Sequence, residues 1–430
     1  MDTLLGRLAS TGTTLFRRRG VWRYVSRAGE SHLVSAQRRS LLLLTLGMVA
    51  LAFNLRPVAV AVAPVLGDIR ADLAMSATTA GVLTTLPVLA FAAFGALAPW
   101  CARRLGMHRV ILAALLLAAG GMAARVATDS SAMFLLLSVP ALAGMATANV
   151  LLPSLVKLHF PSRIGLMTSV YTTVLAFGMT VVSVLTVPLS AATGSWRYGL
   201  LLWAVTAALA ALPWVALTSH DIRPVNGSGT HISVREMART RLAWVTAVFF
   251  GTQALQAYAA FGWLPQIFRD AGFSAATSGL LLGVATGIGI PVSFVLPPLA
   301  ARIANPTPLV LALCGCYAVG YVGLIVAPVA GAWAWATLVG LGTGIFPLVL
   351  TLIGLRTLTS EGTAALSGFA QSVGYLLGAV GPLMMGVLND ATGGWTVPLC
   401  VLIALLIPQA VTGAFVCRPR YLEAELSSSS

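Results

Sequence analysis

Hydrophobic residues are gathered into long runs along almost the whole chain, and short polar breaks separate the runs. In the run LAFNLRPVAVAVAPVL, residues 51–66, only Asn54 and Arg56 are polar. Runs of about 20 apolar residues match the length that an α-helix needs to span a bilayer, whereas barrel strands are shorter and alternate. The pattern therefore predicts an all-α membrane protein with twelve transmembrane helices. The predicted helices are residues 41–66, 78–100, 109–128, 131–156, 164–189, 197–218, 242–267, 276–301, 307–328, 331–355, 362–388 and 396–417.

The composition agrees with this class and excludes soluble ones. Hydrophobic residues make up 58% of the 430 residues and charged residues 9%, whereas a soluble protein carries about 25% charged residues. The net charge of +14 would suit a nucleic-acid-binding protein, but the basic residues lie between the apolar runs, where membrane topology requires them. The five cysteines have neither metal-ligand spacing nor the pattern of a secreted disulfide framework. We therefore expect no nucleic-acid partner, no bound metal and no cofactor.

The basic residues also predict the orientation of the helices. Twelve spans put both termini on one side of the membrane, and 21 of the 26 lysines and arginines fall on that side. The four on the other side are Arg70, Arg125, Arg197 and Arg269. Arg56 falls on neither side. Because basic loops stay in the cytoplasm, both termini are predicted to be cytoplasmic. The near absence of lysine indicates a GC-rich bacterial genome, and hence the inner membrane of a bacterium.

The two halves of the chain are copies of one another. The segment LGDIRADLAMSATTAGVL at 66–83 aligns with LPQIFRDAGFSAATSGLL at 264–281 at a shift of 198, and TGSW at 193–196 aligns with TGGW at 392–395 at a shift of 199. Two six-helix halves in the same orientation are the architecture of the major facilitator fold, in which the substrate site lies between the halves. The predicted parts are a basic cytoplasmic extension (1–40), an N-terminal half (41–218), a cytoplasmic linker (219–241), a C-terminal half (242–417) and a cytoplasmic tail (418–430). The extension either touches anionic lipid or remains a solvated arm.

Arg56 is the ionisable residue that the pattern places near the centre of a span. At about 1.5 Å per residue, it lies within roughly 4 Å of the middle of helix 41–66. A central arginine costs about 2.5–3.5 kcal/mol on insertion scales, and all twelve Asp and Glu residues lie in the extension, loops or helix ends. Arg56 is therefore a candidate receptor for an anionic or dipolar substrate, and the alternative is a structural or gating role. Pro57, which cannot donate to the carbonyl of Phe53, predicts a kink at the same level.

Uncharged polar and aromatic residues extend this candidate site. Two pairs share a helix face through i,i+3 or i,i+4 spacing, namely Gln253 with Gln256 and Gln371 with Tyr375. Asn54 lies two residues before Arg56, so the two side chains should point in roughly opposite directions. Each amide could instead join helices by hydrogen bonds, and each aromatic residue could serve packing alone. The candidate substrate-binding residues are Arg56, Asn54, Asn149, Tyr171, Gln253, Gln256, Tyr258, Trp263, Gln371 and Tyr375.

Five sequence blocks follow one another through both halves. The blocks are FNLRP at 53–57, NVLLPSLVK at 149–157, GLMTSVYTT at 165–173, FGWLPQIFRDAGFS at 261–274 and SGFAQSVGYLLGAVGPLMMGVLND at 367–390. Together they resemble the CynX/NimT group of major facilitators, the cyanate permease-like and 2-nitroimidazole transporters. The resemblance leaves out the N-terminal extension. It implies alternating access by rocking of the halves, a small polar or anionic substrate, and a pathway lined by the first, fourth, seventh and tenth helices.

The superfamily signature between the second and third helices, Gly-x-x-x-Asp-Arg-x-Gly, is altered in this sequence. The aligned stretch PWCARRLGM at 99–107 has Pro99 in place of the glycine and Arg103 in place of the aspartate. Arg104 and Gly106 remain. His159 stands where the family pattern predicts an acidic residue. These changes put the usual charge relay of the cytoplasmic gate in doubt. The candidate gating residues are Arg103, Arg104, Lys157, His159 and Glu361.

The sequence favours a monomeric secondary transporter of a small polar or anionic solute. Cyanate-like anions and nitroimidazole-like compounds are planar acceptors that an arginine can bind. The alternative is proton-driven multidrug efflux, which usually needs a titratable carboxylate within the membrane. Proton coupling would use Asp68 or Glu361 at helix ends or be absent, and the other expected partners are the substrate and membrane lipid. An enzyme or receptor would need a nucleophile, metal ligands or a soluble domain, and no loop is long enough to fold.

Overall fold

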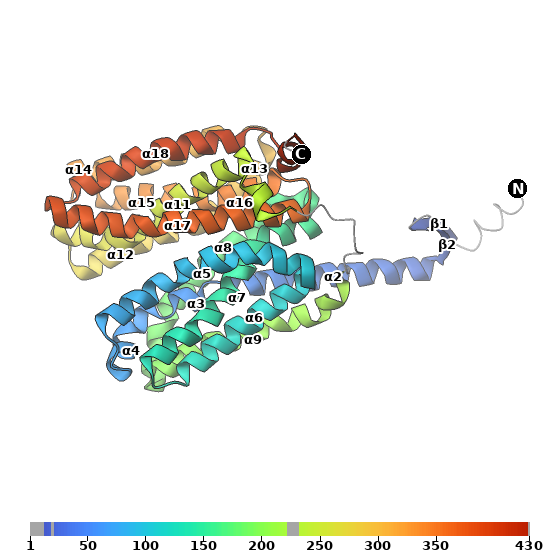
Figure 1. Cartoon of the computed structure of the whole chain (residues 1–430), viewed down its shortest axis with the longest axis horizontal. Coiled ribbons are helices and arrows are strands. Elements are labelled where there is room, and N and C mark those ends of the chain that lie inside the picture. Colours follow the sequence, from blue (N-terminus) through green and yellow to red (C-terminus); the bar gives the residue numbers. More distant parts are fainter. Residues whose placement is uncertain (1–12, 19–20, 222–231, 429–430) are drawn as a thin grey trace, which may run out of the picture. The chain divides into compact units, whose positions relative to one another are not determined.

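The computed structural model describes residues 13–18, 21–221 and 232–428. It separates into two compact units, residues 1–48 and 49–430, and Figure 1 shows the labelled elements. The Pro-, Gly- and Ser-rich centre of the predicted linker, residues 222–231, lies outside the described residues.

The first unit contains more regular structure than the predicted extension. β1 (Thr13–Arg18) and β2 (Val21–Ser26) pair in antiparallel register, with Thr13 opposite Ser26. α2 (Arg27–Asn54) follows and continues into the second unit. This helix begins well before the predicted start at residue 41. The hydrophobic pattern marks only the apolar part of a helix, and residues 27–40 are largely polar.

The second unit is helical throughout its described regular elements. Its N-terminal half contains α3 (Pro57–Val60), η1 (Ala63–Val65), α4 (Leu66–Asp72), α5 (Ala77–Leu105), α6 (Met107–Val126), α7 (Ser131–His159), η2 (Pro161–Arg163), α8 (Ile164–Thr193) and α9 (Trp196–Leu217). The linker contains η3 (Thr218–His220) and α10 (Val234–Met237). The C-terminal half contains α11 (Arg241–Asp270), α12 (Ala275–Gly287), α13 (Gly289–Arg302), α14 (Thr307–Val326), α15 (Ala332–Gly342), α16 (Ile345–Leu355), α17 (Ser360–Thr392) and α18 (Thr396–Cys417), and α19 (Leu422–Ser428) follows.

Among the described residues, ten segments are long and apolar enough to span a membrane. The two remaining predicted spans are also helical. One is the first span, in which the apolar helical stretch Leu41–Asn54 is followed by α3 and η1. The other is α11, whose mean hydropathy is lowered by Gln253 and Gln256. Every one of the twelve predicted runs therefore corresponds to helical structure.

Three of these spans are interrupted near their middle. The first ends at Asn54 and resumes at Pro57, where the proline predicts a kink. The other two differ from the unbroken helices predicted over 276–301 and 331–355, because α12 gives way to α13 at Ile288 and α15 gives way to α16 at residues 343–344. Glycines flank both interruptions, and each glycine lowers helix propensity by about 1 kcal/mol relative to alanine. Pro291 and Pro347 follow the two breaks, and each removes a backbone N–H as Pro57 does. Hydrophobicity alone cannot predict such a break, because the apolar run continues through it.

The internal repeat is visible in the ends of the helices. Ser76 caps α5 and Ser274 caps α12 with the same backbone angles (φ −64°, ψ 157°), and each hydroxyl accepts from the N–H three residues later. Gly194 ends α8 at φ 69° and Gly393 ends α17 at φ 68°, both in the left-handed region that favours glycine. These pairs keep the shifts of 198 and 199 found in the sequence.

Helices of each predicted half pack against one another in the second unit. In Figure 1, α5, α6, α7 and α9 lie together, and α11, α14, α17 and α18 lie together. We call the end of the helices at which the linker residues 218–221 and 232–240 lie the linker side. The turn between α5 and α6 and the turn between α7 and α8 are on this side, because Asp221 hydrogen-bonds to the start of α6 and His108 to the end of α7.

Six side chains on the linker side of the helices join the two halves by hydrogen bonds. They are Asn149 to Gln371 Oε1 (2.7 Å), Ser154 to Ser360 O (2.6 Å), Lys157 to Gly354 O (3.3 Å), Ser169 to Phe294 O (2.7 Å), Thr172 to Ser293 O (3.4 Å) and Ser367 to Val150 O (2.8 Å). The halves therefore meet closely between the middle of the helices and the linker side.

Candidate functional site

Arg56 lies at the break in the first transmembrane helix. It directly precedes α3, and its carbonyl accepts from Val60 N at 3.0 Å. The side chain is half-buried, and no carboxylate oxygen of the described residues lies within 4.0 Å of it. Its Cζ lies 5.8 Å from the centre of the Phe346 ring, within the range of a cation–π interaction. Phe346 follows the break between α15 and α16, so two helix interruptions from different halves form this contact.

A chain of aromatic rings continues from Phe346. Between ring centres, Phe250 lies 6.1 Å from Phe346 and 5.0 Å from Tyr375. Tyr375 in turn lies 4.4 Å from Phe91 and 6.4 Å from Tyr258. Phe91 belongs to α5 in the N-terminal half, and the other four rings belong to the C-terminal half. The rings thus line the boundary between the halves, near the middle of α5, α11 and α17.

The guanidinium of Arg56 lies near two tyrosines of this aromatic cluster. It lies close enough to Tyr258 and Tyr375 to interact electrostatically with their phenol groups. Of the candidate residues, the fold therefore brings Arg56, Tyr258 and Tyr375 into one group, together with rings that were not predicted. This arrangement combines an unpaired cation, phenol groups and ring faces, which can hold a planar anion or dipole by charge, hydrogen bonding and stacking.

Two candidate amides close the cluster toward the linker side. Asn149 Nδ2 donates to Gln371 Oε1 across the halves, and Gln371 Nε2 donates to Ser367 Oγ at 2.8 Å. Gln371 lies one turn before Tyr375 on α17, as the i,i+4 spacing predicts. Asn149 and Gln371 are both buried, and the bond between them joins the two halves. In this conformation the Asn149–Gln371 hydrogen bond lies on the linker side of the aromatic cluster.

The other three candidate amides form hydrogen bonds within one half, which is the alternative that the sequence left open. Asn54 Nδ2 donates to Ala50 O, and its Oδ1 accepts from Thr206. Gln253 accepts from Gln409 Nε2 at 2.8 Å and donates to Thr343 O at 3.3 Å, and Gln256 accepts from Tyr321 and donates to Leu402 O. Thr343 lies in the break between α15 and α16, where its carbonyl accepts from Phe346 N at 3.0 Å. Its usual donor is missing because residue 347 is proline, so Gln253 supplies a second hydrogen bond to this carbonyl.

The two remaining aromatic candidates are Tyr171 and Trp263. Tyr171 on α8 is buried, with 1% of its surface exposed. Trp263 donates from Nε1 to Pro382 O at 2.8 Å, within the C-terminal half. Its ring centre lies 5.4 Å from that of Trp395, at the end of the helices away from the linker side. Trp263 thus makes a hydrogen bond and a ring contact within the C-terminal half.

Comparison with known proteins places this geometry in a family. Residues 41–382 match the family model of the Major Facilitator Superfamily. The chain belongs to the major facilitator superfamily. As a facilitator it is a multi-pass membrane transporter of the secondary class and not an enzyme.

Several relatives of this facilitator cover most of both chains. It is 37% identical to the uncharacterized transporter YycB of Bacillus subtilis, over 87% of this chain and 94% of YycB. It is 35% identical to the 2-nitroimidazole transporter of Escherichia coli (88% and 96% covered) and 27% identical to the cyanate transport protein CynX of the same species (84% and 94% covered). The resemblance to the CynX/NimT group is therefore confirmed. The structure of the proton:xylose symporter XylE superposes with a TM-score of 0.71 at 15% identity, covering 91% of this chain and 98% of XylE, and shares the fold.

The candidate gating and coupling residues of the facilitator lie at helix ends. Arg103 donates to Ile232 O at 3.5 Å, and the Arg104 guanidinium lies 4.6 Å from the Trp100 ring centre. Lys157 donates across the halves to Gly354 O. Glu361 is exposed in the first turn of α17, and Asp68 is exposed in the first turn of α4.

A cluster around His159 was only partly anticipated from the sequence. His159 Nε2 lies 2.9 Å from His108 Nε2, and His108 Nδ1 lies 2.6 Å from Asp221 Oδ1. The Asp221 carboxylate also accepts from the backbone N–H groups of His108 (3.1 Å) and Arg109 (3.0 Å), so it caps α6 from the linker. The sequence shows that an acidic residue is missing near His159, but only the fold shows that Asp221 supplies one. Gly106, at φ 94°, has no Cβ that would collide with this carboxylate.

Two arginines that the sequence assigns to the two membrane faces are in fact buried. Arg125 is 1% exposed inside the N-terminal half, where it donates to Val58 O at 3.4 Å. Arg356 is 7% exposed and donates to Val416 O and Cys417 O at the end of α18. Burial lowers the pKa of the Arg356 guanidinium, which nevertheless stays charged. Hydropathy indicates how far along a span a residue lies but not which neighbouring helix its side chain faces. The burial of Arg125 and Arg356 was therefore visible only in the tertiary structure.

Proposed function

We propose that this facilitator moves a small, planar, polar or anionic solute by alternating access, through a site between the halves centred on Arg56. The observation that carries the proposal is a half-buried guanidinium at mid-span that has no carboxylate partner among the described residues and faces an aromatic ring of the other half. A central cation in a membrane is costly. A solute anion or dipole would provide the partner that the described residues do not.

The surrounding rings favour a flat solute. Phe346, Tyr258 and Tyr375 present ring faces and phenol groups within one cluster, and such groups stack on or hydrogen-bond to a planar acceptor. The relatives named for 2-nitroimidazole and cyanate transport agree with this chemistry, since 2-nitroimidazole is a planar acceptor and cyanate is a small linear anion. We therefore assign the chain a cyanate-like anion or a nitroimidazole-like compound as its substrate class.

We also propose that the linker side faces the cytoplasm. The linker side carries 21 of the 26 basic residues in the predicted topology, and basic loops remain cytoplasmic. With this orientation, the hydrogen bonds between the halves close the cytoplasmic side, and the Arg56 cluster would receive solute from the other side. Rocking of the halves would break these bonds and release the solute inward.

The test is ligand-induced stabilisation of the purified protein. Thermal unfolding would be followed with cyanate, with 2-nitroimidazole and with the bulky cation tetraphenylphosphonium. A ligand at 100 times its dissociation constant adds about 2.7 kcal/mol to the stability of the bound state. We expect stabilisation by cyanate or 2-nitroimidazole, and we expect Arg56→Gln to fold normally but to lose it. Arg163→Gln, at an exposed arginine of η2, should behave as the unmodified protein.

Two results would contradict the proposal. Unchanged ligand affinity in Arg56→Gln would show that the guanidinium is structural. Stabilisation by the bulky cation alone would instead support proton-driven multidrug efflux. Flux of the stabilising ligand into proteoliposomes with and without a pH gradient would then test proton coupling, with Asp68→Asn and Glu361→Gln as the variants that remove the two candidate carboxylates.

A further inference from the structure

The two copies of the repeat differ at the end of the helices away from the linker side. In the N-terminal half, Arg197 at the start of α9 ties three elements together. Its guanidinium donates to Val126 O (2.7 Å) and Thr128 O (2.8 Å) at the end of α6, and to the carboxylates of Asp72 (2.9 Å) and Asp129 (2.8 Å). Trp196 Nε1 donates to the same Asp72 oxygen at 3.1 Å. In the N-terminal half, the guanidinium of Arg197 therefore holds α4, α6 and α9 together by hydrogen bonds.

The C-terminal half keeps the carboxylate and the indole but not the cation. Trp395 Nε1 donates to Asp270 Oδ2 at 2.8 Å, which repeats the contact of Trp196 with Asp72 at shifts of 199 and 198. The residue that corresponds to Arg197 is Thr396. Within the described residues, no lysine or arginine nitrogen lies within 4.0 Å of the Asp270 carboxylate.

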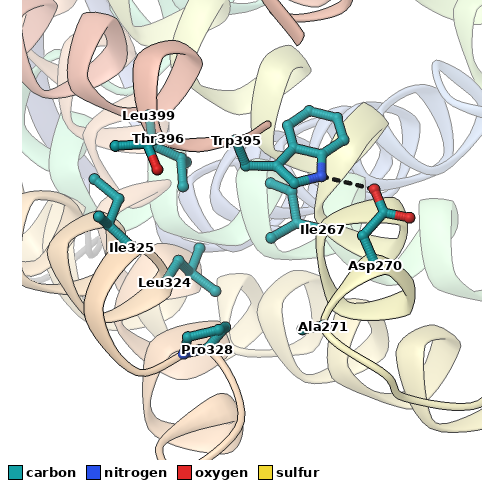
Figure 2. A pocket seen from close by; sticks show the side chains of 9 residues that line it. All are labelled: Ile267, Asp270, Ala271, Leu324, Ile325, Pro328, Trp395, Thr396 and Leu399. Atoms are coloured by element: carbon teal, nitrogen blue, oxygen red, sulfur yellow. Dashed lines mark hydrogen bonds between the residues drawn. The ribbon is translucent and has the colours of Figure 1, made fainter. Parts of the chain in front are cut away.

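A pocket lies where the guanidinium would be. It has a volume of about 190 Å³, and Figure 2 shows Asp270 and Trp395 at one side of it and Leu324, Ile325 and Pro328 at the other. Ile267, Ala271, Thr396 and Leu399 complete the lining. Since a water needs only about 10–15 Å³ of such space, the pocket has room for a ligand of several atoms.

The polar and apolar parts of this lining specify the ligand. Asp270 accepts neutral hydrogen bonds from Trp395 and from Gln266 Nε2 (2.7 Å), so its negative charge is not neutralised by them. The last turn of α14 contributes Leu324 and Ile325, and the carbonyls of a final helical turn lack intrahelical donors and carry partial negative charge. The remaining walls are apolar side chains. The site therefore suits a cation with N–H donors and a short apolar tail.

We propose that this pocket binds a small monovalent organic cation of the alkylguanidinium or alkylammonium class, in the position that Arg197 fills in the N-terminal half. The N–H groups of the ligand would donate to Asp270 and to the end of α14, and its alkyl chain would pack against Leu399 and Pro328. The bound cation would tie α11, α14 and α18 together as Arg197 ties α4, α6 and α9. This site is separate from the Arg56 cluster and selects the opposite charge.

The experiment compares propylguanidinium with propylurea, which has the same shape and no charge. Binding to the purified full-length protein would be measured by calorimetry and by thermal unfolding. We expect propylguanidinium to bind and stabilise the protein and propylurea to do neither. Asp270→Asn should weaken binding at least about tenfold, because it replaces a charge-assisted hydrogen bond by a neutral one. Asp390→Asn, at an exposed carboxylate near the end of α17 that does not line the pocket, should bind as the unmodified protein.

A second variant tests the position of the site. Thr396→Arg should place a guanidinium in the pocket from within the chain, raise the unfolding temperature and abolish the effect of propylguanidinium. Arg56→Gln should leave propylguanidinium binding unchanged, which separates this site from the proposed substrate site. Equal binding of propylurea, or unchanged propylguanidinium binding in both Asp270→Asn and Thr396→Arg, would overturn the proposal, as would the absence of propylguanidinium binding.

Discussion

At the scale of single residues, two arginines of the N-terminal half show opposite ways of placing a cation in a membrane protein. Arg197 makes four hydrogen bonds, two of them to carboxylates. Arg125 makes one long bond to Val58 O, and its Nε and second terminal nitrogen have no hydrogen-bond partner among the described residues. A buried charge without full compensation lowers stability, so it is retained for another reason. Val58 lies two residues after Arg56, which indicates that Arg125 holds the broken segment in place.

Methionine at these two positions should therefore have effects of opposite sign. We expect Arg125→Met to raise the free energy of unfolding by about 1–3 kcal/mol, because one long hydrogen bond and the Phe134 ring, 5.6 Å from Cζ, compensate the buried charge only in part. The same variant should weaken the stabilisation by the substrate of Arg56, because the α3 segment loses its anchor. Arg197→Met should lower the free energy of unfolding by about 1–3 kcal/mol through the lost hydrogen bonds. Thermal unfolding with and without ligand measures both quantities, and a loss of stability in Arg125→Met would show that the charge is compensated.

The Asp221 carboxylate gives a second prediction at this scale. It accepts from two backbone N–H groups at the start of α6 and from the His108 ring, so Asp221→Asn removes one of the two accepting oxygens and a charge at a helix N-terminus. We expect a loss of about 1–2 kcal/mol in unfolding free energy. Asp68→Asn removes the same charge from an exposed position in the first turn of α4 and should change stability by much less. Equal unfolding temperatures for the two variants would contradict the capping role.

At the scale of helices, local signals predict the ends of elements better than their interiors. Ser76 and Ser274 mark the starts of α5 and α12 because a serine hydroxyl satisfies free N–H groups wherever a helix begins. Pro57 marks a break because its ring removes a hydrogen bond. The breaks at Ile288 and at residues 343–344 have a comparable local cause, because Pro291 and Pro347 lack the N–H that would donate to the carbonyls of Gly287 and Thr343. The bond from Gln253 to Thr343 O shows that a contact with another helix also supports the second break.

Gly340 tests the packing between the two interrupted spans of the C-terminal half. A Cβ at Gly340 would meet the backbone oxygen of Ala285 at 2.5 Å, so α15 could not approach α12 as closely. We expect Gly340→Ala to lower the free energy of unfolding by about 1–3 kcal/mol. A Cβ at Gly283, on α12 itself, would meet nothing within 4 Å, so Gly283→Ala should stabilise the helix by about 0.5–1 kcal/mol. If Gly340→Ala and Gly283→Ala changed the unfolding temperature in the same direction, close packing of α15 on α12 at Gly340 would be contradicted.

At the scale of the whole molecule, the sequence predicts the architecture and only part of the candidate site. Hydrophobic runs and the repeat specify twelve helices in two halves, because both follow from the length of a span and from internal similarity. The position of Arg56 was also predictable, since a charge in a long apolar run needs no three-dimensional information to be noticed. Phe91 and Phe346 were not predictable, because a phenylalanine in such a run looks like any lipid-facing or core residue. The roles of Gln253 and Gln256 likewise required their partners to be known.

The hydrogen bonds between the halves should determine which side of the transporter is closed. Ser154 and Ser169 each donate across the boundary, to Ser360 O and to Phe294 O, and both lie between the middle of the helices and the linker side. Each bond contributes about 1 kcal/mol, so removing both hydroxyls should favour opening of the linker side by about 30-fold. The variant is Ser154→Ala with Ser169→Ala in one chain.

Spin labels would measure this opening directly. Cysteines at Arg163 and Arg302, which are exposed on the linker side of different halves, would carry the labels in a background without the five native cysteines. The distance distribution between the labels should shift to longer values in the double serine variant. Ser138→Ala with Ser190→Ala removes two buried hydroxyls from the same two helices, α7 and α8, but these donate to Phe134 O and Thr186 O within their own helices. This control should keep the distribution of the unmodified protein, because its lost bonds do not connect the halves. If both double variants gave the same distribution, the cross-boundary bonds would have no part in closing the linker side.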